Sequence, residues 1–338
     1  MVPREDASDQ GAWQTMIRFR RLLKQAIASP IGWRVVSRHY RQPGVSVLMY
    51  HRVTAPDAWR QGLEVDVFRQ QMRWLRRRCL IIRPEDLLRY VAAPRTSRPP
   101  VLITFDDGYR DFYDNAFPIL SELEIPSVVF LSTSYIENGG LIWTDGLAWA
   151  VASAADRQVR LPWSEARVFD LCSADERSRL LHAAKAHLTQ VPDAERKEAL
   201  AQLFEELGVW LHDAKIERQM MTWEEVRSTG GLTSIGGHSH THPILSQLDE
   251  AAMETEISLC RECILSQTGE APKCFAYPNG RQQDFSDATK RLLRHHGFEL
   301  AFSTIEGING PDVDPLAIRR QPTGAANMGD FACLVGAM

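Results

Sequence analysis

Short apolar runs rich in β-branched residues recur along the chain and predict buried β-strands. The first run covers residues 45–50 and ends at His51. Further runs of this kind lie at residues 79–82, 101–105, 127–131, 233–235, 273–277, 300–303 and 317–319. Apolar residues at helical spacing, such as Phe68, Met72 and Leu75, separate several of these runs. Strands that alternate with helices indicate parallel βα units, so the pattern predicts an α/β fold, a distorted (β/α) barrel of about seven to eight strands.

The alternation stops between about residues 141 and 221. Residues 173–211 are rich in leucine at helical spacing, which predicts a helical insertion in one βα loop. The rhythm resumes at Thr222, where Glu225 three residues later gives the spacing of a capping box. The chain therefore divides into an N-terminal segment (1–44), a barrel (45–325) that carries this insertion, and a C-terminal tail (326–338).

The N-terminal segment is strongly basic and has helical periodicity. Between residues 13 and 41, one side is apolar and the other carries arginine and lysine, among them Arg18, Arg21 and Lys24. Such a helix either packs on the barrel with its charged face in solvent or makes a peripheral contact with an anionic membrane surface. The sequence leaves both interpretations open.

Composition narrows the class of protein. The 338 residues are 44% hydrophobic and 24% charged, with a net charge of -4, so no nucleic-acid partner is expected. No run approaches the roughly 18 apolar residues of a membrane span. The polar, acidic start lacks the features of a signal peptide, and six scattered cysteines favour a reducing compartment. We expect a cytoplasmic protein, peripheral at the inner membrane surface if residues 13–41 bind lipid.

Candidate chemistry gathers where the predicted strands end. Asp106 and Asp107 follow the run 101–105, while His238 and His242 follow the run 233–235. In a parallel barrel these ends meet on one rim. Two imidazoles and one carboxylate suit Zn²⁺ with one position open, although Co²⁺, Ni²⁺ or Fe²⁺ fit the same ligands. The other carboxylate is then free to act as a base.

Three motifs resemble the polysaccharide deacetylases of the NodB-homology class, carbohydrate esterase family four. They are Thr-Phe-Asp-Asp-Gly at 104–108, His-Ser-x-x-His at 238–242 and Tyr-Pro-x-Gly at 277–280. The resemblance covers about residues 45–323 and implies a metal-dependent N-deacetylase on a distorted (β/α) barrel. It implies that Asp106 is the catalytic base and that the turn at Pro278 and Asn279 supplies an oxyanion-binding backbone N–H. The metal ligands that it implies are Asp107, His238 and His242.

The chain departs from the usual family pattern at two points. The arginine that orients the base is missing before Pro278, so Arg319 and Arg320 are the candidate replacements. The histidine of a C-terminal Leu-x-His motif is also missing. His51, at the end of the first strand, resembles the acid of the permuted branch, which includes poly-N-acetylglucosamine deacetylases. A structural histidine is the alternative at this position.

The predicted activity is release of acetate from an N-acetylated sugar in a saccharide or glycolipid, during exopolysaccharide or lipopolysaccharide assembly. Tyr109, Trp143 and Tyr277 are candidates for the substrate rim, and for Trp143 core or lid packing is the alternative. A hydrolase of another small amide, of the deformylase or imidase type, remains open. So does a catalytically silent sugar-binding module, although such a relative would be expected to have lost part of the ligand set.

Overall fold

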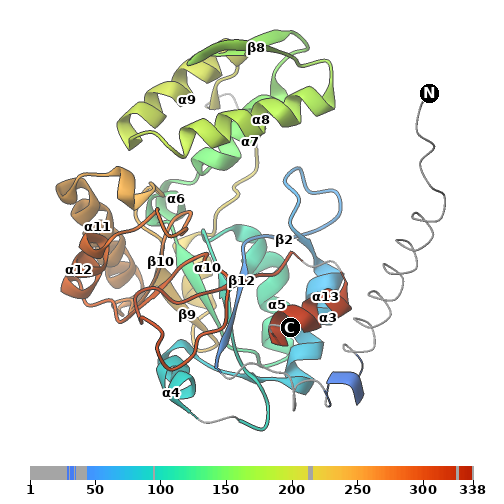
Figure 1. Ribbon diagram of the computed structural model, residues 1–338, viewed down its shortest axis with the longest axis vertical. Coiled ribbons are helices and arrows are strands. Elements are labelled where there is room, and N and C mark those ends of the chain that lie inside the picture. Colours follow the sequence, from blue (N-terminus) through green and yellow to red (C-terminus); the bar gives the residue numbers. More distant parts are fainter. Residues whose placement is uncertain are drawn as a thin grey trace, which may run out of the picture.

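An eight-stranded parallel sheet forms the centre of the protein (Figure 1). The computed structural model describes residues 29, 31–33, 35, 44–93, 96–211, 216–324 and 327–336. The spatial order is β11 (Leu300–Phe302), β10 (Cys274–Ala276), β9 (Thr233–Gly237), β6 (Ser127–Leu131), β5 (Pro100–Phe105), β1 (Ser46–Tyr50) and β12 (Gln321–Pro322), and β4 (Leu80–Ile81) pairs with β5. Most of these strands coincide with the apolar runs of the sequence, because most of their residues are buried.

One short segment joins the two edges of the sheet. Ile318 forms a parallel bridge with Phe302 of β11, and three residues later β12 pairs with β1. The strand predicted at residues 317–319 is thus a single bridge, and regular pairing begins only at Gln321. Pro322 has no N–H to give to a ladder, which keeps this last strand short. The predicted distorted (β/α) barrel of about seven to eight strands is confirmed.

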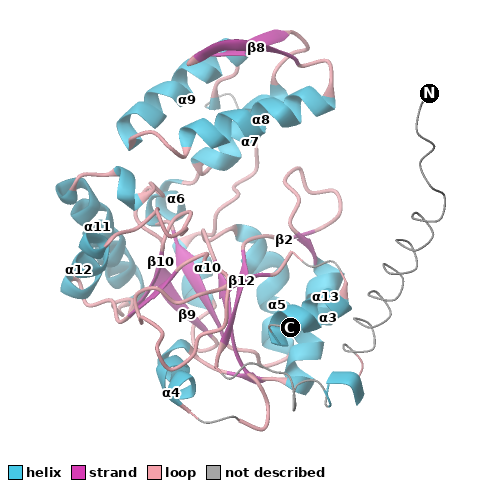
Figure 2. Cartoon of the chain, in the orientation of Figure 1, coloured by secondary structure: helices cyan, strands magenta, loops and turns pink. Residues whose placement is uncertain are grey.

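Helices cover the outside of the barrel (Figure 2). They are α3 (Val65–Arg78), α4 (Leu87–Ala92), α5 (Phe117–Glu122), α6 (Thr133–Asn138), α10 (Trp223–Ser228), α11 (Glu250–Thr268), α12 (Asp287–His295) and α13 (Met328–Gly336). Single turns form at η1 (Pro84–Asp86), η2 (Phe112–Ala116) and η4 (Leu245–Gln247), and β2 (Val53–Thr54) pairs with β3 (Leu63–Glu64). Helix α13 lies in the segment predicted as a C-terminal tail, and its Phe331 is fully buried against Trp74.

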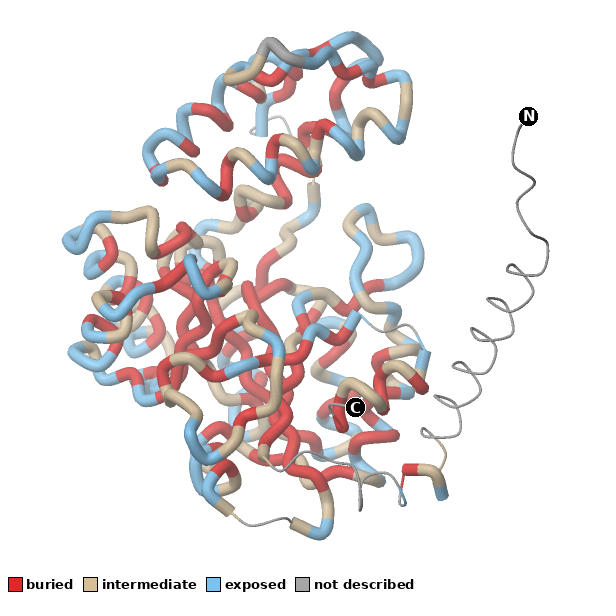
Figure 3. The backbone as a smooth tube through the Cα atoms, in the orientation of Figure 1, coloured by how far each residue is buried: buried red, intermediate tan, exposed pale blue. Residues whose placement is uncertain are grey.

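The predicted insertion is a separate lobe above the barrel (Figure 1). It contains α7 (Trp143–Ser153), β7 (Gln158–Leu161), β8 (Ser164–Asp170), α8 (Ala174–Leu188) and α9 (Asp193–Leu207). Leu180, Leu188 and Leu203 are fully buried in a cluster that draws its buried members from the lobe alone. Figure 3 shows this second set of buried positions, apart from those of the barrel strands. The antiparallel β7–β8 hairpin was not predicted from the sequence.

Most of the basic segment 1–44 lies outside the described residues, and with it the membrane contact predicted for residues 13–41. Trp33 is described, and it is buried with its ring 4.6 Å from that of Trp74. None of the described helices has the length and apolar character needed to cross a membrane. Membrane contact and cytoplasmic location stay predictions.

Candidate active site

The acidic turn at the end of β5 buries two adjacent carboxylates, since Asp106 is 2% exposed and Asp107 5%. Asp107 and Gly108 both have positive φ, at 74° and 84°. The positive φ of Gly108 favours glycine, and a Cβ atom there would lie 2.8 Å from Ile136 Cδ1, so the Ile136 side chain would have to shift. This backbone gives the two carboxylates different partners.

Asp106 is paired with a fully buried arginine. Arg320 donates from Nη1 to Oδ1 (2.6 Å) and from Nη2 to Oδ2 (2.8 Å) of Asp106, while its Nε donates to the Ser303 carbonyl. Burial alone would raise the pKa of Asp106, but the charges of Arg320, His238 and His51 and the Arg320 hydrogen bonds together outweigh burial and hold that pKa below its usual value. Of the two arginines named from the sequence, Arg319 is placed elsewhere. Its guanidinium faces outward and donates to the Glu306 carbonyl.

Asp107 lies between two histidines. Its Oδ1 atom is 3.2 Å from Nε2 of His238 and 3.2 Å from Nε2 of His242. His238 Nδ1 lies 2.7 Å from the carbonyl oxygen of Ala276, and donating its proton there leaves the Nε2 lone pair directed at Asp107. A hydrogen bond of this kind at Nδ1 orients an imidazole whose Nε2 binds a metal ion. The three ligand atoms lie within 4.8 Å of one another.

This arrangement fits a divalent metal ion better than it fits a proton. Asp107 Oδ1 is buried and finds no hydrogen-bond partner among the described residues. Burial lowers the pKa of His242. Burial also acts to lower the pKa of His238, but Asp107, Asp106 and the Ala276 hydrogen bond together outweigh it and raise that pKa. A proton is therefore favoured on His238 but not on His242, whereas one cation would be bound by Asp107, His238 and His242 together. Tetrahedral zinc with an open position takes such a donor set.

Backbone strain is concentrated at the same place. Five non-glycine residues of the described chain have positive φ, and four of them belong to the site loops. These four are Asp107, Ser239, His242 and Asn279. Such conformations cost of order 1–3 kcal/mol each and persist where surrounding contacts impose them. The loops are therefore held in shapes that place side chains, at some cost in stability.

His51 and Asn279 complete the rim of this site. His51 follows β1, its side chain is 47% exposed, and its Nε2 lies 3.7 Å from Asp106 Oδ2. The Asn279 side chain is fixed by a hydrogen bond to Asp284, and within the described chain its backbone N–H meets no acceptor. That N–H is therefore available to a bound group. Pro278 lies in the same turn, where its carbonyl accepts from the Gly280 N–H.

A cleft of about 610 Å³ runs between this rim and the insertion. The barrel contributes His51, Asp106, Asp107, His238, His242 and Asn279, and the insertion contributes Thr144, Asp145 and Lys185. Tyr109 lines the cleft, and its hydroxyl donates to Asp145 (2.8 Å); its contact with a substrate stays a prediction. Tyr277 also lines it, but its hydroxyl is buried against the Leu316 carbonyl.

Trp143 is a correction to the predicted rim. It is not among the described residues that line the cleft, although its neighbours Thr144 and Asp145 are. Its ring lies 4.9 Å from the Arg196 guanidinium and packs between the cores of the barrel and the insertion. Trp143 begins α7, and its ring packs against both cores.

Sequence reasoning missed four charged residues of the cleft, namely Arg52, Arg60, Asp145 and Lys185. Arg52 is adjacent to His51, and Asp145 follows Trp143 by two positions, so both lay beside residues already singled out. Arg60 and Lys185 carried no motif. They reach the cleft only because the β2–β3 loop and the insertion fold toward it.

The sequence profile of the family described as polysaccharide deacetylase matches residues 93–163 and 193–301, more than half of the chain. The chain belongs to the polysaccharide deacetylase family. It is 27% identical over 112 residues to the poly-beta-1,6-N-acetyl-D-glucosamine N-deacetylase of Staphylococcus epidermidis, a match that covers 29% of this chain and 39% of that protein. It is 29% identical over 123 residues to the protein of the same name from Escherichia coli strain K12, covering 35% and 16%. The chain thus spans well under half the length of these relatives.

Solved structures show the same fold. The structure of IcaB from Ammonifex degensii has a TM-score of 0.56 at 20% identity and covers 88% of this chain and 98% of that one. The Streptococcus pyogenes deacetylase PplD, solved in complex with acetate, has a TM-score of 0.52 at 18% identity, with coverage of 82% and 92%. At these identities the likeness concerns the barrel and not the substrate.

Proposed function

We propose that this protein is a metal-dependent N-deacetylase that hydrolyses the acetamide of an N-acetylated sugar in a saccharide or glycolipid. One observation carries the proposal. A carboxylate oriented by a buried arginine, Asp106 with Arg320, lies directly beside a three-ligand cluster of Asp107, His238 and His242. Family membership supports the same chemistry.

Each residue of the rim has a distinct part in amide hydrolysis. A cation held by the ligand cluster would polarise a carbonyl group and make a water molecule more acidic. Asp106 accepts the proton of the attacking water, and the two hydrogen bonds from Arg320 fix the direction of its carboxylate. The Asn279 N–H donates to the carbonyl oxygen as negative charge develops there. His51 gives a proton to the departing nitrogen, so that acetate and a free amine are released.

The test is acetate release from N-acetylated oligosaccharides by the zinc-loaded protein and its variants. Asp106→Asn and His51→Ala should each lower kcat by about 10²- to 10⁴-fold, because each removes a proton-transfer group. Both variants should bind zinc as the parent does, measured by metal analysis. His182→Ala, an exposed histidine of α8, is the matched control. An Asp106→Asn variant with full activity would remove Asp106 from the mechanism.

The same assay separates the alternatives. Hydrolysis of formamides or cyclic imides with no release of acetate from sugars would identify a different amide hydrolase. Saccharide and zinc binding without turnover of any amide would identify a silent binding module. The complete Asp106–Arg320 pair and ligand cluster favour the deacetylase over that module.

A further inference from the structure

The insertion side of the cleft carries a cluster of charged groups that the proposed hydrolysis does not use. Arg52, Arg60 and Lys185 line the cleft together with the buried Asp145. Asp145 accepts from Arg52 Nη2 (2.8 Å), from Arg60 Nε (3.0 Å) and from the Tyr109 hydroxyl. One carboxylate therefore serves two guanidinium groups.

The charges of this cluster do not cancel. Arg52 has a second partner in Asp111, at 3.1 Å, which leaves Asp145 to balance Arg60. The Lys185 ammonium group makes neither an ion pair nor a hydrogen bond within the described part of the chain. Asp106 is already paired with Arg320. The wall of the cleft nearest the insertion thus has an excess of positive charge.

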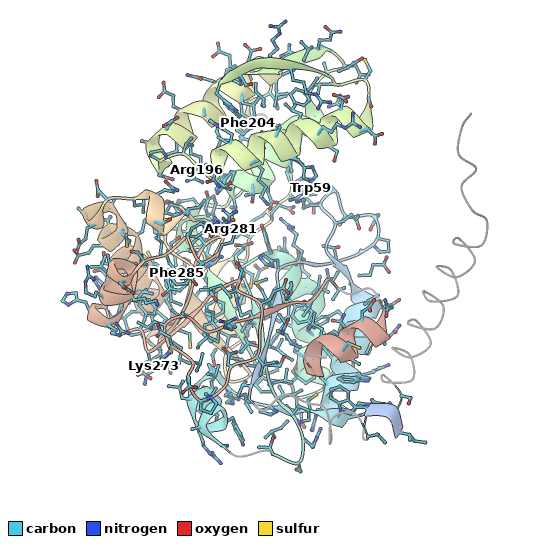
Figure 4. The ribbon with its side chains drawn as sticks, in the orientation of Figure 1. Trp59, Arg196, Phe204, Lys273, Arg281 and Phe285 are labelled. Carbon is cyan, nitrogen blue, oxygen red and sulfur yellow. The ribbon has the colours of Figure 1, made fainter. Side chains whose placement is uncertain are left out.

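Arg60 and Lys185 have donors left for a ligand. Only Nε of Arg60 is engaged, and its two terminal nitrogens meet no described partner. These two nitrogens form a fork that suits a carboxylate or phosphate. Arg60 is on the β2–β3 loop, next to Trp59, which Figure 4 places beneath the insertion. Lys185 is exposed on α8 and lines the same cleft.

We propose that Arg60 and Lys185 form a subsite for an anionic group, a phosphate or a carboxylate, borne by the N-acetylated saccharide. This inference rests on the proposed function and narrows its substrate class to acidic saccharides. Attraction between the cleft and such a group acts on binding, whereas Asp106 and His51 act on the amide. A cleft of about 610 Å³ has room for the group beside the sugar ring.

The experiment uses three matched N-acetylhexosamine trisaccharides: neutral, terminally phosphorylated, and containing one hexuronate. We expect kcat/KM for an anionic substrate to be about threefold to tenfold higher than for the neutral substrate at low salt. The two values should approach each other near 0.5 M salt. The two anionic substrates distinguish phosphate from carboxylate. Equal kcat/KM for all three substrates would overturn the proposal.

Variants locate the effect. Lys185→Glu and Arg60→Gln should bring the ratio of the two kcat/KM values close to one, while Arg60→Lys, which keeps the charge, should retain part of the preference. Arg179→Ala, on the same helix but paired with Glu176, is the control. A preference unchanged in both subsite variants would also overturn the proposal.

A direct measurement of binding tests the anionic subsite without requiring turnover. Calorimetry with analogues that carry hydroxyl in place of acetamide measures affinity even if no acetate is released from any substrate. Tighter binding of the anionic analogue that depends on Lys185 would support the subsite although the deacetylase assignment had failed. Equal affinity for the neutral and anionic analogues would refute it.

Discussion

At the scale of single residues, the site contains an ion pair between two buried side chains, Asp106 and Arg320. Arg320 is fully buried and reaches Asp106 from the segment that closes the barrel. The sequence showed that an arginine was missing before Pro278 and offered two replacements. It could not decide between Arg319 and Arg320, because adjacent residues of an extended segment point to opposite faces.

Arg320→Lys tests this pairing. Lysine keeps the charge but cannot make two parallel hydrogen bonds, so we expect the carboxylate of Asp106 to lose its fixed orientation and kcat to fall by about tenfold to 100-fold. Because Arg320 lowers the pKa of Asp106, the acid limb of the kcat/KM profile should move to higher pH in Arg320→Met. Activity of Arg319→Lys should match that of the parent. If the acid limb did not move, Arg320 would not be the group that lowers the pKa of the proposed base.

Removal of Arg320 should also affect folding. A buried carboxylate that loses its partner costs about 3–5 kcal/mol of stability, so Arg320→Met should unfold at lower urea concentration than Arg320→Lys. Activity is therefore compared at a temperature where circular dichroism shows both variants folded.

At the scale of elements, the contact between η2 and the start of β2 contains a carboxyl group whose pKa rises on folding. Asp111 accepts from the Val53 N–H (3.0 Å) and from Arg52 (3.1 Å). Burial is nevertheless the larger effect and, with a smaller contribution from the charge of Asp145, raises the pKa of Asp111 to about 7. The unfolded chain has a value near about 3.9.

This shift gives a stability prediction with a definite sign. Between about pH 4 and pH 7 the folded state binds more protons at Asp111 than the unfolded state does, so this group lowers stability as pH rises. Asp111→Asn removes the effect, and its urea-unfolding free energy should decline less with pH than that of the parent. The difference in slope is at most about 1.4 kcal/mol per pH unit. Asp114→Asn, half-exposed nearby, is the control, and an equal slope in both variants would contradict the assignment.

The elements also show what the sequence can specify. Buried strands such as β6 follow from continuous apolar runs, since both faces of the strand must be covered. The β7–β8 hairpin was missed because it has only one buried face, its ladder shifts register near Leu161, and Pro162 and Trp163 give no glycine-containing turn signal. Its pairing depends on the lobe around it.

At the scale of the whole molecule, the barrel and the insertion have different cores and one shared cleft. The three proposed metal ligands all come from the barrel, on the loops after β5 and β9. The insertion contributes Lys185 and Asp145 to the cleft but no ligand. The order of the motifs in the sequence predicted that the ligands belong to the barrel. The charged residues that face each other across the cleft could be identified only from the structure.

Zinc binding should therefore stabilise the two parts unequally. A ligand at about 100 times its dissociation constant adds about 2.7 kcal/mol to the part that binds it, which corresponds to a rise of about 5–10 °C in the midpoint for a domain of this size. We expect calorimetry of the chelator-treated protein to show two transitions, with zinc raising only that of the barrel. His242→Ala should abolish the rise. If zinc raised both transitions together, the insertion would unfold with the barrel, and its separate core would not make it an independent folding unit.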